Sequence, residues 1–355
     1  MINSYGDYMI VGVIKAFWSN KGVTQPQVSP TALHFTRGNF ERSFLFFFLY
    51  VTFVVCIVDF LKTMNVTLKN DILAVEVNDH GAELQSIRKG AVEYLWQGDP
   101  AYWGRRSPVL FPIVGSVWEK KYRVDGKVYE LGQHGFARDM DFELVLQSET
   151  EVRYRLTYSQ ETLEKFPYPF ILYIGYKLSG NTVEVIWEVE NPSDKEMFFQ
   201  IGAHPAFIYP DYDQQKTERG YLSFDRNEGL ECIRIKEKGC VDAVTKYPLK
   251  IPADGKLPIT SDTFDAIDTI MLQDSQVHKV AMMRADGSPW LSLSFDAPVV
   301  GIWSPPGKIA PFICIEPWYG RCDSAGYEGE YCEKDWVNRL GAGEKFSSVY
   351  KVEIE

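Results

Sequence analysis

Alternating hydrophobic and polar positions dominate the chain from about residue 64 onward. The alternation is clear in residues 73–77 (LAVEV) and again in residues 348–354 near the chain end. Successive side chains of a strand point to opposite faces, so a period of two predicts strands with one buried face. Further short runs predict strands at residues 83–87, 122–124, 128–131, 142–146, 152–158, 171–178, 183–189, 197–201, 290–295, 299–303 and 312–315.

Turn residues separate many of these runs. Asp125-Gly126 indicates a hairpin, and Ser179-Gly180-Asn181 separates two further predicted strands. Helical periodicity is confined to residues 160–166 and 328–340, and the lack of a fixed repeat argues against a propeller. We therefore predict an all-β fold, a large antiparallel β-sandwich or barrel with few short helices, formed as one domain by residues 64–355.

The first 63 residues differ in composition from the rest of the chain. They carry five Lys or Arg against three Asp or Glu, and they include a 15-residue apolar run at 44–58, FLFFFLYVTFVVCIV. Three interpretations stay open: a segment absent from the native protein, which would then begin at Met64; a membrane anchor through residues 44–61; or a signal peptide. The first implies a cytoplasmic protein, and only the second gives it a membrane partner.

Composition limits the partners of the chain. The net charge is −11, and no Lys/Arg-rich run occurs, which argues against nucleic acid as a partner. None of the cysteines forms a C-x-x-C pair, so a structural zinc site is not expected. Scattered free thiols in a reducing compartment are favoured, with disulfides left open; the cysteines are Cys56, Cys232, Cys240, Cys314, Cys322 and Cys332.

Two of the five histidines stand where a cleft is expected. His134 lies between two glycines in GQHGFARD, and His204 follows an apolar run in IGAHPAF. Strand ends are where a sandwich directs side chains into a binding site. His80 and His278 stand in polar surroundings and are expected at the surface, whereas His34 belongs to the first 63 residues.

Charged residues near similar strand ends complete the candidate set. Glu316 follows the apolar run FICI and precedes Pro317-Trp318, so its carboxylate needs a partner if it is buried. Arg105 and Arg106 stand in WGRRSPVLFPIVG, Arg138 in HGFARD and Asp268 in FDAIDTIML. Each of them has an ordinary structural interpretation as well, as a surface ion pair or a strand-end carboxylate.

Four motifs in order, WGRRSPVLFPIVG, GQHGFARDMDFEL, IGAHPAF and ICIEPW, resemble the aldose 1-epimerase (galactose mutarotase-like) superfamily, in particular its LacX-type branch. The resemblance runs from about residue 64 to residue 355. It implies a β-supersandwich with a sugar cleft on one face. It also implies mutarotation, the interconversion of the α and β anomers of an aldose, without a metal or organic cofactor. The resemblance leaves open whether the sugar is free or phosphorylated and whether the protein forms a homodimer.

The resemblance also implies roles for individual residues. Glu316 would be the general base that takes the anomeric hydroxyl proton, and His204 the general acid that protonates the ring oxygen. His134 would bind the sugar, with Asp268 holding a hydroxyl. Arg106 and Arg138 would line the cleft. Mutarotation requires one base and one acid placed around a hemiacetal, and a Glu–His pair meets that requirement.

Three other functions stay open at this stage. A glycoside-acting enzyme would need a second carboxylate near Glu316. A carbohydrate-binding or sugar-sensing protein could use the same aromatic and arginine side chains without catalysis. A metal enzyme could use His134, His204 and Glu316 as a two-His-one-carboxylate set.

Overall fold

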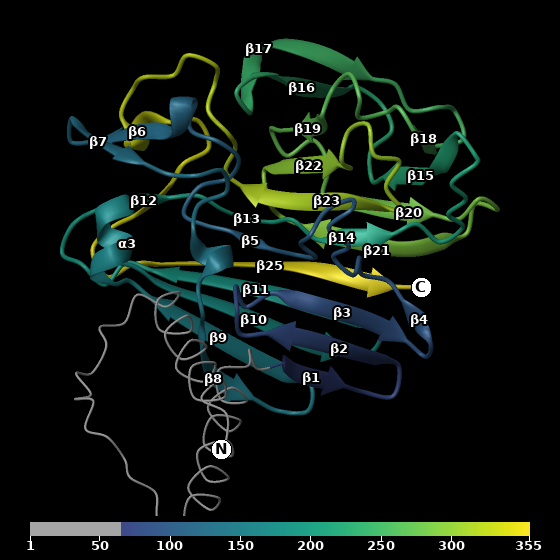
Figure 1. Cartoon of the computed structure of the whole chain (residues 1–355), viewed down its shortest axis with the longest axis horizontal. Coiled ribbons are helices and arrows are strands. Elements are labelled where there is room, and N and C mark those ends of the chain that lie inside the picture. Colours follow the sequence, from purple (N-terminus) through teal and green to yellow (C-terminus); the bar gives the residue numbers. More distant parts are fainter. Residues whose placement is uncertain (1–64) are drawn as a thin grey trace, which may run out of the picture. The chain divides into compact units, whose positions relative to one another are not determined.

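Two large antiparallel sheets form the framework of residues 65–355, the part of the chain that the computed structural model describes (Figure 1). One sheet has nine strands. Its order is β18 (Leu257–Thr260), β15 (Glu218–Phe224), β20 (Lys279–Met283), β21 (Pro289–Phe295), β25 (Lys345–Ile354), β11 (Thr182–Glu190), β10 (Ile171–Ser179), β9 (Glu151–Thr157) and β8 (Glu143–Gln147).

The second sheet has eight strands and carries the candidate chemistry. Its order is β17 (Cys240–Leu249), β16 (Leu230–Glu237), β19 (Thr269–Leu272), β22 (Val299–Trp303), β23 (Phe312–Tyr319), β13 (Ile201–Ala203) and β5 (Val109–Leu110), with β14 (Ala206–Ile208) also paired to β23. In the view of Figure 1, β19, β22 and β23 lie above β25 and β8–β11 of the nine-stranded sheet.

Smaller elements complete the fold. A four-stranded sheet of β1 (Asn65–Lys69), β2 (Leu73–Asn78), β3 (Leu84–Lys89) and β4 (Val92–Glu93) contacts β9 and β10 through β1. Two-stranded sheets join β6 (Lys121–Val124) to β7 (Lys127–Glu130) and β12 (Met197–Phe199) to β24 (Asn338–Leu340). The helices are α3 (Gln160–Lys165) and the 3-10 turns η1 (Trp118–Lys120), η2 (Ala137–Asp139) and η3 (Tyr331–Glu333). The predicted all-β sandwich with few short helices is confirmed.

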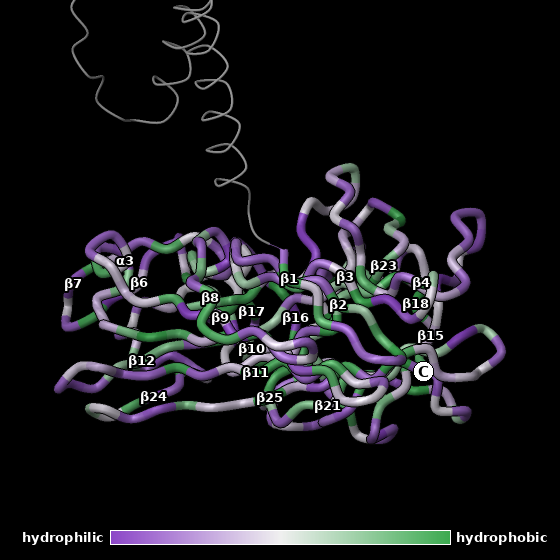
Figure 2. The backbone as a smooth tube through the Cα atoms, turned by 90° about the horizontal axis from the view of Figure 1, so that it is seen from below, coloured by the Kyte–Doolittle hydropathy of each residue, from purple (hydrophilic) through white to green (hydrophobic). Residues whose placement is uncertain are grey.

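The period-two pattern places the core between the sheets. In β11 the odd-numbered residues from Val183 to Val189 are buried and their neighbours are partly exposed. β11 pairs with β10 along its whole length, closing a hairpin at Gly180, whose φ of +60° suits glycine. Figure 2 shows hydrophobic and hydrophilic stretches alternating along these strands, with the projecting loops mostly hydrophilic.

Both faces of β23 are buried, and one of these faces carries the candidate site. Ile313 and Ile315 point into the core between the sheets. The alternate residues Cys314, Glu316 and Trp318 lie on the opposite face and are buried as well. A buried strand face that carries a carboxylate needs a cover that supplies polar partners. Loops from several parts of the chain form that cover.

One of the two predicted helices is present. α3 begins after Ser159, whose side chain accepts the Thr162 N–H in a capping box, and it ends before Pro167. The helix predicted at residues 328–340 is wrong, because that segment contains η3, an extended backbone at Lys334, a left-handed residue at Trp336 (φ +60°) and β24.

Among residues 65–355, no helix has the length and apolar character needed to cross a membrane. The apolar run at 44–58, its three interpretations and His34 fall outside the described residues.

Candidate active site

A cleft of about 330 Å³ opens over the outer face of the eight-stranded sheet. Its volume lies at the lower end of the range for small-ligand sites, which suits a single sugar ring. The lining joins residues far apart in sequence: Trp103, Gly115, Gln133, His134, Arg138, His204, Ile235, Gly239, Asp268, Thr269, Met271, Trp303, Glu316, Trp318 and Cys322. Most of the candidates from the sequence therefore meet in one place.

Glu316 stands in the middle of the cleft floor. It lies on the central strand β23, directly opposite Gly301 of β22, and only 1% of its surface is exposed. Its Oε2 atom has no hydrogen-bond partner among the described residues. A buried, unpartnered carboxylate oxygen is costly for stability, and such groups are typical of sites that act on a ligand.

Trp318 forms the flat part of the floor beside Glu316. Its indole lies over two glycines, and a Cβ atom on Gly301 or Gly202 would approach the ring to 2.4 or 2.6 Å. The indole N–H donates to the carbonyl of Ala203 over 3.2 Å, which fixes the orientation of the ring. The two glycines therefore allow an aromatic surface to lie next to the carboxylate.

His204 follows β13 and approaches Glu316 from the neighbouring strand. Its Nε2 atom lies 3.4 Å from the Oε2 atom of Glu316. The imidazole stacks on the indole of Trp103 with a centroid distance of 4.7 Å and meets Trp303 edge-on at 5.3 Å. These two aromatic contacts hold the ring in a fixed orientation against the carboxylate.

His134 is held by a tight turn after β7. Its backbone is left-handed (φ +66°), as is that of Gly135, where a Cβ atom would lie 2.3 Å from the carbonyl oxygen of Phe111. The Nδ1 atom of His134 accepts the Gly115 N–H over 3.1 Å. In the neutral ring Nε2 therefore carries the proton and is the donor available to a ligand.

Asp268 and Arg138 bring one negative and one positive charge to the rim of the site. Asp268 lies in a left-handed conformation (φ +59°) just before β19, and its carboxylate accepts the Thr269 hydroxyl over 2.9 Å. Arg138, on η2, donates from Nη2 to the carbonyl of Gln133 over 2.8 Å. Its buried Nε atom lies 3.8 Å from Oδ2 of Asp139 and makes no hydrogen bond with the described residues. Burial lowers the pKa of Arg138 to about 10, which leaves it charged at neutral pH.

The structure does not bring Arg106 into the cleft. Its guanidinium turns away and donates to the carbonyl of Gln85 over 2.8 Å, while its backbone N–H donates to Glu83. The preceding residue, Arg105, pairs with Asp139 at 2.7 Å and contributes positive charge near both histidines. His80 and His278 are exposed, as expected from their polar surroundings.

Burial sets the charge state of the pair formed by His204 and Glu316. It raises the pKa of Glu316 well above the ordinary value, and the charge of Asp268 raises it further. It lowers the pKa of His204 to about 3, and the positive charge of Arg138 adds to this shift. The pair therefore holds one proton in total and carries no net charge over a wide pH range.

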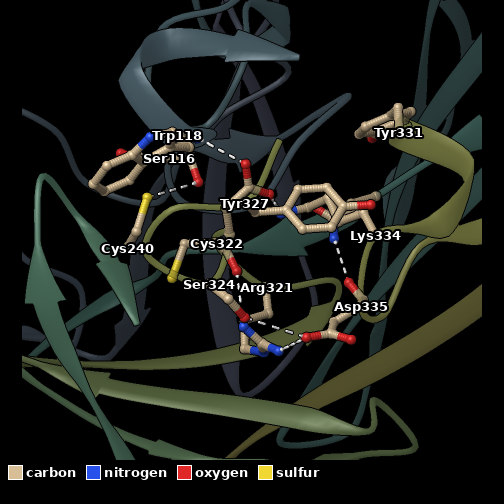
Figure 3. A network of polar contacts seen from close by, with 12 residues as sticks. Ser116, Trp118, Cys240, Arg321, Cys322, Ser324, Tyr327, Tyr331, Lys334 and Asp335 are labelled. Atoms are coloured by element: carbon tan, nitrogen blue, oxygen red, sulfur yellow. Dashed lines mark hydrogen bonds and ion pairs between the residues drawn. The ribbon is translucent and has the colours of Figure 1, made fainter. Parts of the chain in front are cut away.

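A buried ion pair supports the wall of the cleft (Figure 3). Lys334 and Asp323 pair with each other, and both are almost fully buried. The same Asp323 carboxylate accepts the backbone N–H of Trp118 over 2.7 Å. Next to it, Cys322 packs so closely on Gly115 that a Cβ atom there would lie 2.5 Å away. This network fixes the loop whose amide orients the imidazole of His134.

Among the lining residues that were not predicted as site residues are Trp103, Gln133 and Trp303. Trp103 and Trp303 enclose His204, and Gln133 holds Arg138 through its carbonyl. The sequence contains one signal for the aromatic pair, because each tryptophan lies at the edge of a predicted site motif or strand. Ordinary core tryptophans give the same signal, so the pattern alone does not separate them.

The side chains that lie close enough together to suggest a metal site differ from the three residues considered from the sequence. Among residues 65–355, the potential ligand atoms of three side chains lie within 4.8 Å of one another, those of His204, Cys314 and Glu316. His134 is not part of this group.

Comparison with known proteins tests the resemblance found in the sequence. The family model for aldose 1-epimerase matches residues 64–348. The chain belongs to the aldose 1-epimerase family. The LacX protein of Lactococcus lactis is 33% identical over 271 residues, which cover 74% of this chain and 89% of that protein. The resemblance to the LacX-type branch is therefore confirmed.

Solved structures of family members share the fold. A galactose mutarotase related enzyme from Lactobacillus acidophilus is 32% identical, with a TM-score of 0.76, covering 82% of this chain and 97% of that one. A galactose mutarotase-like protein from Lactobacillus casei gives the same identity and TM-score, covering 82% and 100%. A galactose 1-epimerase from Lactobacillus acidophilus, 16% identical with a TM-score of 0.58, covers 82% and 94% and shares the fold.

Proposed function

We propose that this protein interconverts the α and β anomers of an aldose. The observation that carries the proposal is the close approach of His204 Nε2 to Glu316 Oε2, 3.4 Å, inside a cleft of sugar size. An acid and a base that share one proton supply what a hemiacetal needs to open and close. Membership of the aldose 1-epimerase family supports the same activity.

The reaction follows from the two positions of the shared proton. With the proton on His204, the Glu316 carboxylate takes the proton of the anomeric hydroxyl while His204 protonates the ring oxygen. The C1–ring-oxygen bond breaks and C1 becomes an aldehyde. Glu316 is then protonated and His204 neutral, which is the charge state that burial favours. Rotation about C1–C2 and the reverse transfers close the ring as the other anomer.

The remaining lining residues bind the sugar in this proposal. The Nε2–H group of His134 donates to a sugar oxygen near His204, whose ring centroid lies 5.5 Å away. Asp268 accepts a hydroxyl, and Arg138 donates to another oxygen at the rim. The indoles of Trp103, Trp303 and Trp318 provide apolar surfaces for the faces of the ring.

A free aldose fits the charges of the cleft better than a phosphorylated one. Among residues 65–355, Arg138 is the one Lys or Arg in the lining, and Asp268 offsets it with a negative charge. A phosphate dianion would gain a single guanidinium and meet an opposing carboxylate. We therefore propose an uncharged aldose as substrate, with the hexose 6-phosphate as the alternative that the assay distinguishes.

Polarimetry tests the proposal. The wild type should accelerate the rotation change of fresh α-D-glucose or α-D-galactose, and Glu316→Gln should abolish this acceleration while preserving side-chain volume. Glu161→Gln, which alters an exposed carboxylate on α3, is the matched control and should behave as wild type. Saturable sugar binding without acceleration in the wild type would instead indicate a sugar-sensing protein.

The second carboxylate in the cleft supports one other candidate. Asp268 lines the same cavity as Glu316, as a glycoside-acting enzyme would require. Release of nitrophenol from nitrophenyl glycosides distinguishes this activity, because mutarotation breaks no glycosidic bond. We expect no release above that of Glu316→Gln.

A further inference from the structure

Cys314 is a buried thiol beside the proposed acid–base pair that the proposed reaction does not use. It precedes Glu316 by two residues on β23, so both side chains extend from the same face of the strand. Its exposed fraction is 0%, and it does not line the cleft. Its Sγ atom, one ring nitrogen of His204 and one carboxylate oxygen of Glu316 all lie within 4.8 Å of one another.

The spacing of these atoms is close to that of metal ligands. A tetrahedral zinc ion with bonds of about 2.0–2.3 Å holds its ligand atoms roughly 3.3–3.7 Å apart. His204 Nε2 and Glu316 Oε2 are already 3.4 Å apart. Because all three ligand atoms lie within 4.8 Å of one another, the sulfur has to approach by about 1 Å at most to reach this spacing.

The environment of the three side chains also suits a cation. Glu316 Oε2 and His204 Nδ1 are buried and have no hydrogen-bond partner within residues 65–355, so the site has unused lone pairs. His204 and Glu316 line the cleft, which gives an ion a path from solvent and leaves a fourth position for water. A thiolate, an imidazole and a carboxylate together favour zinc-like ions over magnesium or calcium.

We propose that His204, Cys314 and Glu316 bind a thiophilic divalent cation such as Zn²⁺, and that the bound ion blocks the reaction. On binding, the proton of the Cys314 thiol and the proton shared by His204 and Glu316 are released to solvent, and the thiolate, the imidazole and the carboxylate each donate a lone pair to the metal. Inhibition rests on the proposed mutarotase function, because the ion occupies the two atoms that transfer protons. Binding of the ion does not depend on that function.

Inhibition is tested with zinc and cysteine variants. Zn²⁺ should abolish the mutarotase activity of the wild type, and EDTA should restore it. Cys314→Ser and Cys314→Ala should keep the basal activity and need more than about tenfold higher Zn²⁺ for half-inhibition. Cys332→Ser, which changes an exposed cysteine, should remain as sensitive as wild type. Equal sensitivity of both Cys314 variants and the wild type would overturn the proposal.

Cobalt gives a readout that needs no enzymatic activity. Co²⁺ added to the full-length wild type should produce a thiolate-to-cobalt charge-transfer band with one ion per chain. The band should be absent in Cys314→Ser and Cys314→Ala and should persist in Cys332→Ser. If the protein proves inactive toward aldoses but shows this pattern, the function fails and the metal site stands. A band that persists in both Cys314 variants, or no band in the wild type, refutes the site.

Discussion

The Nε2 atom of His204 lies 3.4 Å from the Oε2 atom of Glu316, and the two side chains come from neighbouring strands of one sheet. Both are buried, and burial disfavours charge on each of them. Two buried groups that share one proton are suited to transferring it, because the pair carries no net charge in either position of the proton. The predictions below follow from this pair and from the residues that position it.

The pair should make the activity insensitive to pH near neutrality. A second proton enters only when His204 is protonated, and its pKa is lowered to about 3. The single proton is lost only when Glu316 ionises, and burial raises that pKa above the ordinary range of a carboxyl group. Therefore kcat/KM, corrected for the buffer reaction, should be flat across the titration range of an ordinary histidine, about pH 6–7. A fall with an apparent pKa near 6.5 would contradict this charge assignment.

The two arginines from different motifs should behave differently. Arg138 lines the cleft, whereas Arg106 donates to the carbonyl of Gln85 outside it. Arg138→Met should raise KM by roughly tenfold to a hundredfold, as expected for a lost charged hydrogen bond to the sugar. Arg106→Met should leave KM unchanged. Steady-state kinetics with a free aldose measure both, and an equal rise for Arg106→Met would place that residue at the sugar.

Gly301→Ala should displace the indole beside the Glu316 carboxylate. The added Cβ atom would lie 2.4 Å from the ring of Trp318, so the ring has to move. Displacement of about 1 Å next to the reacting atoms should lower kcat/KM roughly tenfold to a hundredfold. Gly175→Ala is the matched strand control, because its Cβ meets Ile186 at an ordinary 3.4 Å. Similar activity in the two variants would show that the indole does not position the sugar.

The buried ion pair behind the His134 loop should be important for stability. Lys334→Met leaves the Asp323 carboxylate buried with the Trp118 N–H as its remaining described partner, and should lower the free energy of unfolding by about 3–5 kcal/mol. Urea unfolding followed by tryptophan fluorescence measures this change. Lys165→Met, which removes the exposed partner of Glu161, should unfold as the wild type does. A wild-type unfolding midpoint for Lys334→Met would refute the role of this pair.

The fold was predictable where one strand face is buried. Residues 183–189 alternate strictly in their burial, and in the sequence Ile186 alone departs from the alternation. Asp125-Gly126 closes the hairpin between β6 and β7. Strands such as β15 to β18 were not predicted, because their patterns are irregular and partly exposed. Their formation depends on pairing with distant strands, and local sequence carries little of that information.

The residues that form the site could be predicted from the sequence better than the way in which their side chains pack. The four ordered motifs contain His134, His204, Glu316 and Arg138, and Asp268 joined the candidates as a carboxylate next to an apolar run. The structure places all five at one cleft. Sequence could not decide which of two consecutive arginines faces the cleft. That choice depends on contacts with residues far away in the sequence, such as the Gln85 carbonyl and Asp139.

Anomer exchange measured by NMR on free and 6-phosphorylated aldoses tests the central claim most directly. We expect the wild type to exchange the anomers of at least one free aldose faster than they exchange in buffer alone. We also expect this exchange to be faster than that of the 6-phosphate of the same aldose with the enzyme. Glu316→Gln, folded and of wild-type stability, should exchange them at the buffer rate. A wild type that accelerates no member of the panel, or a Glu316→Gln variant that retains the wild-type rate, would contradict proton transfer by His204 and Glu316.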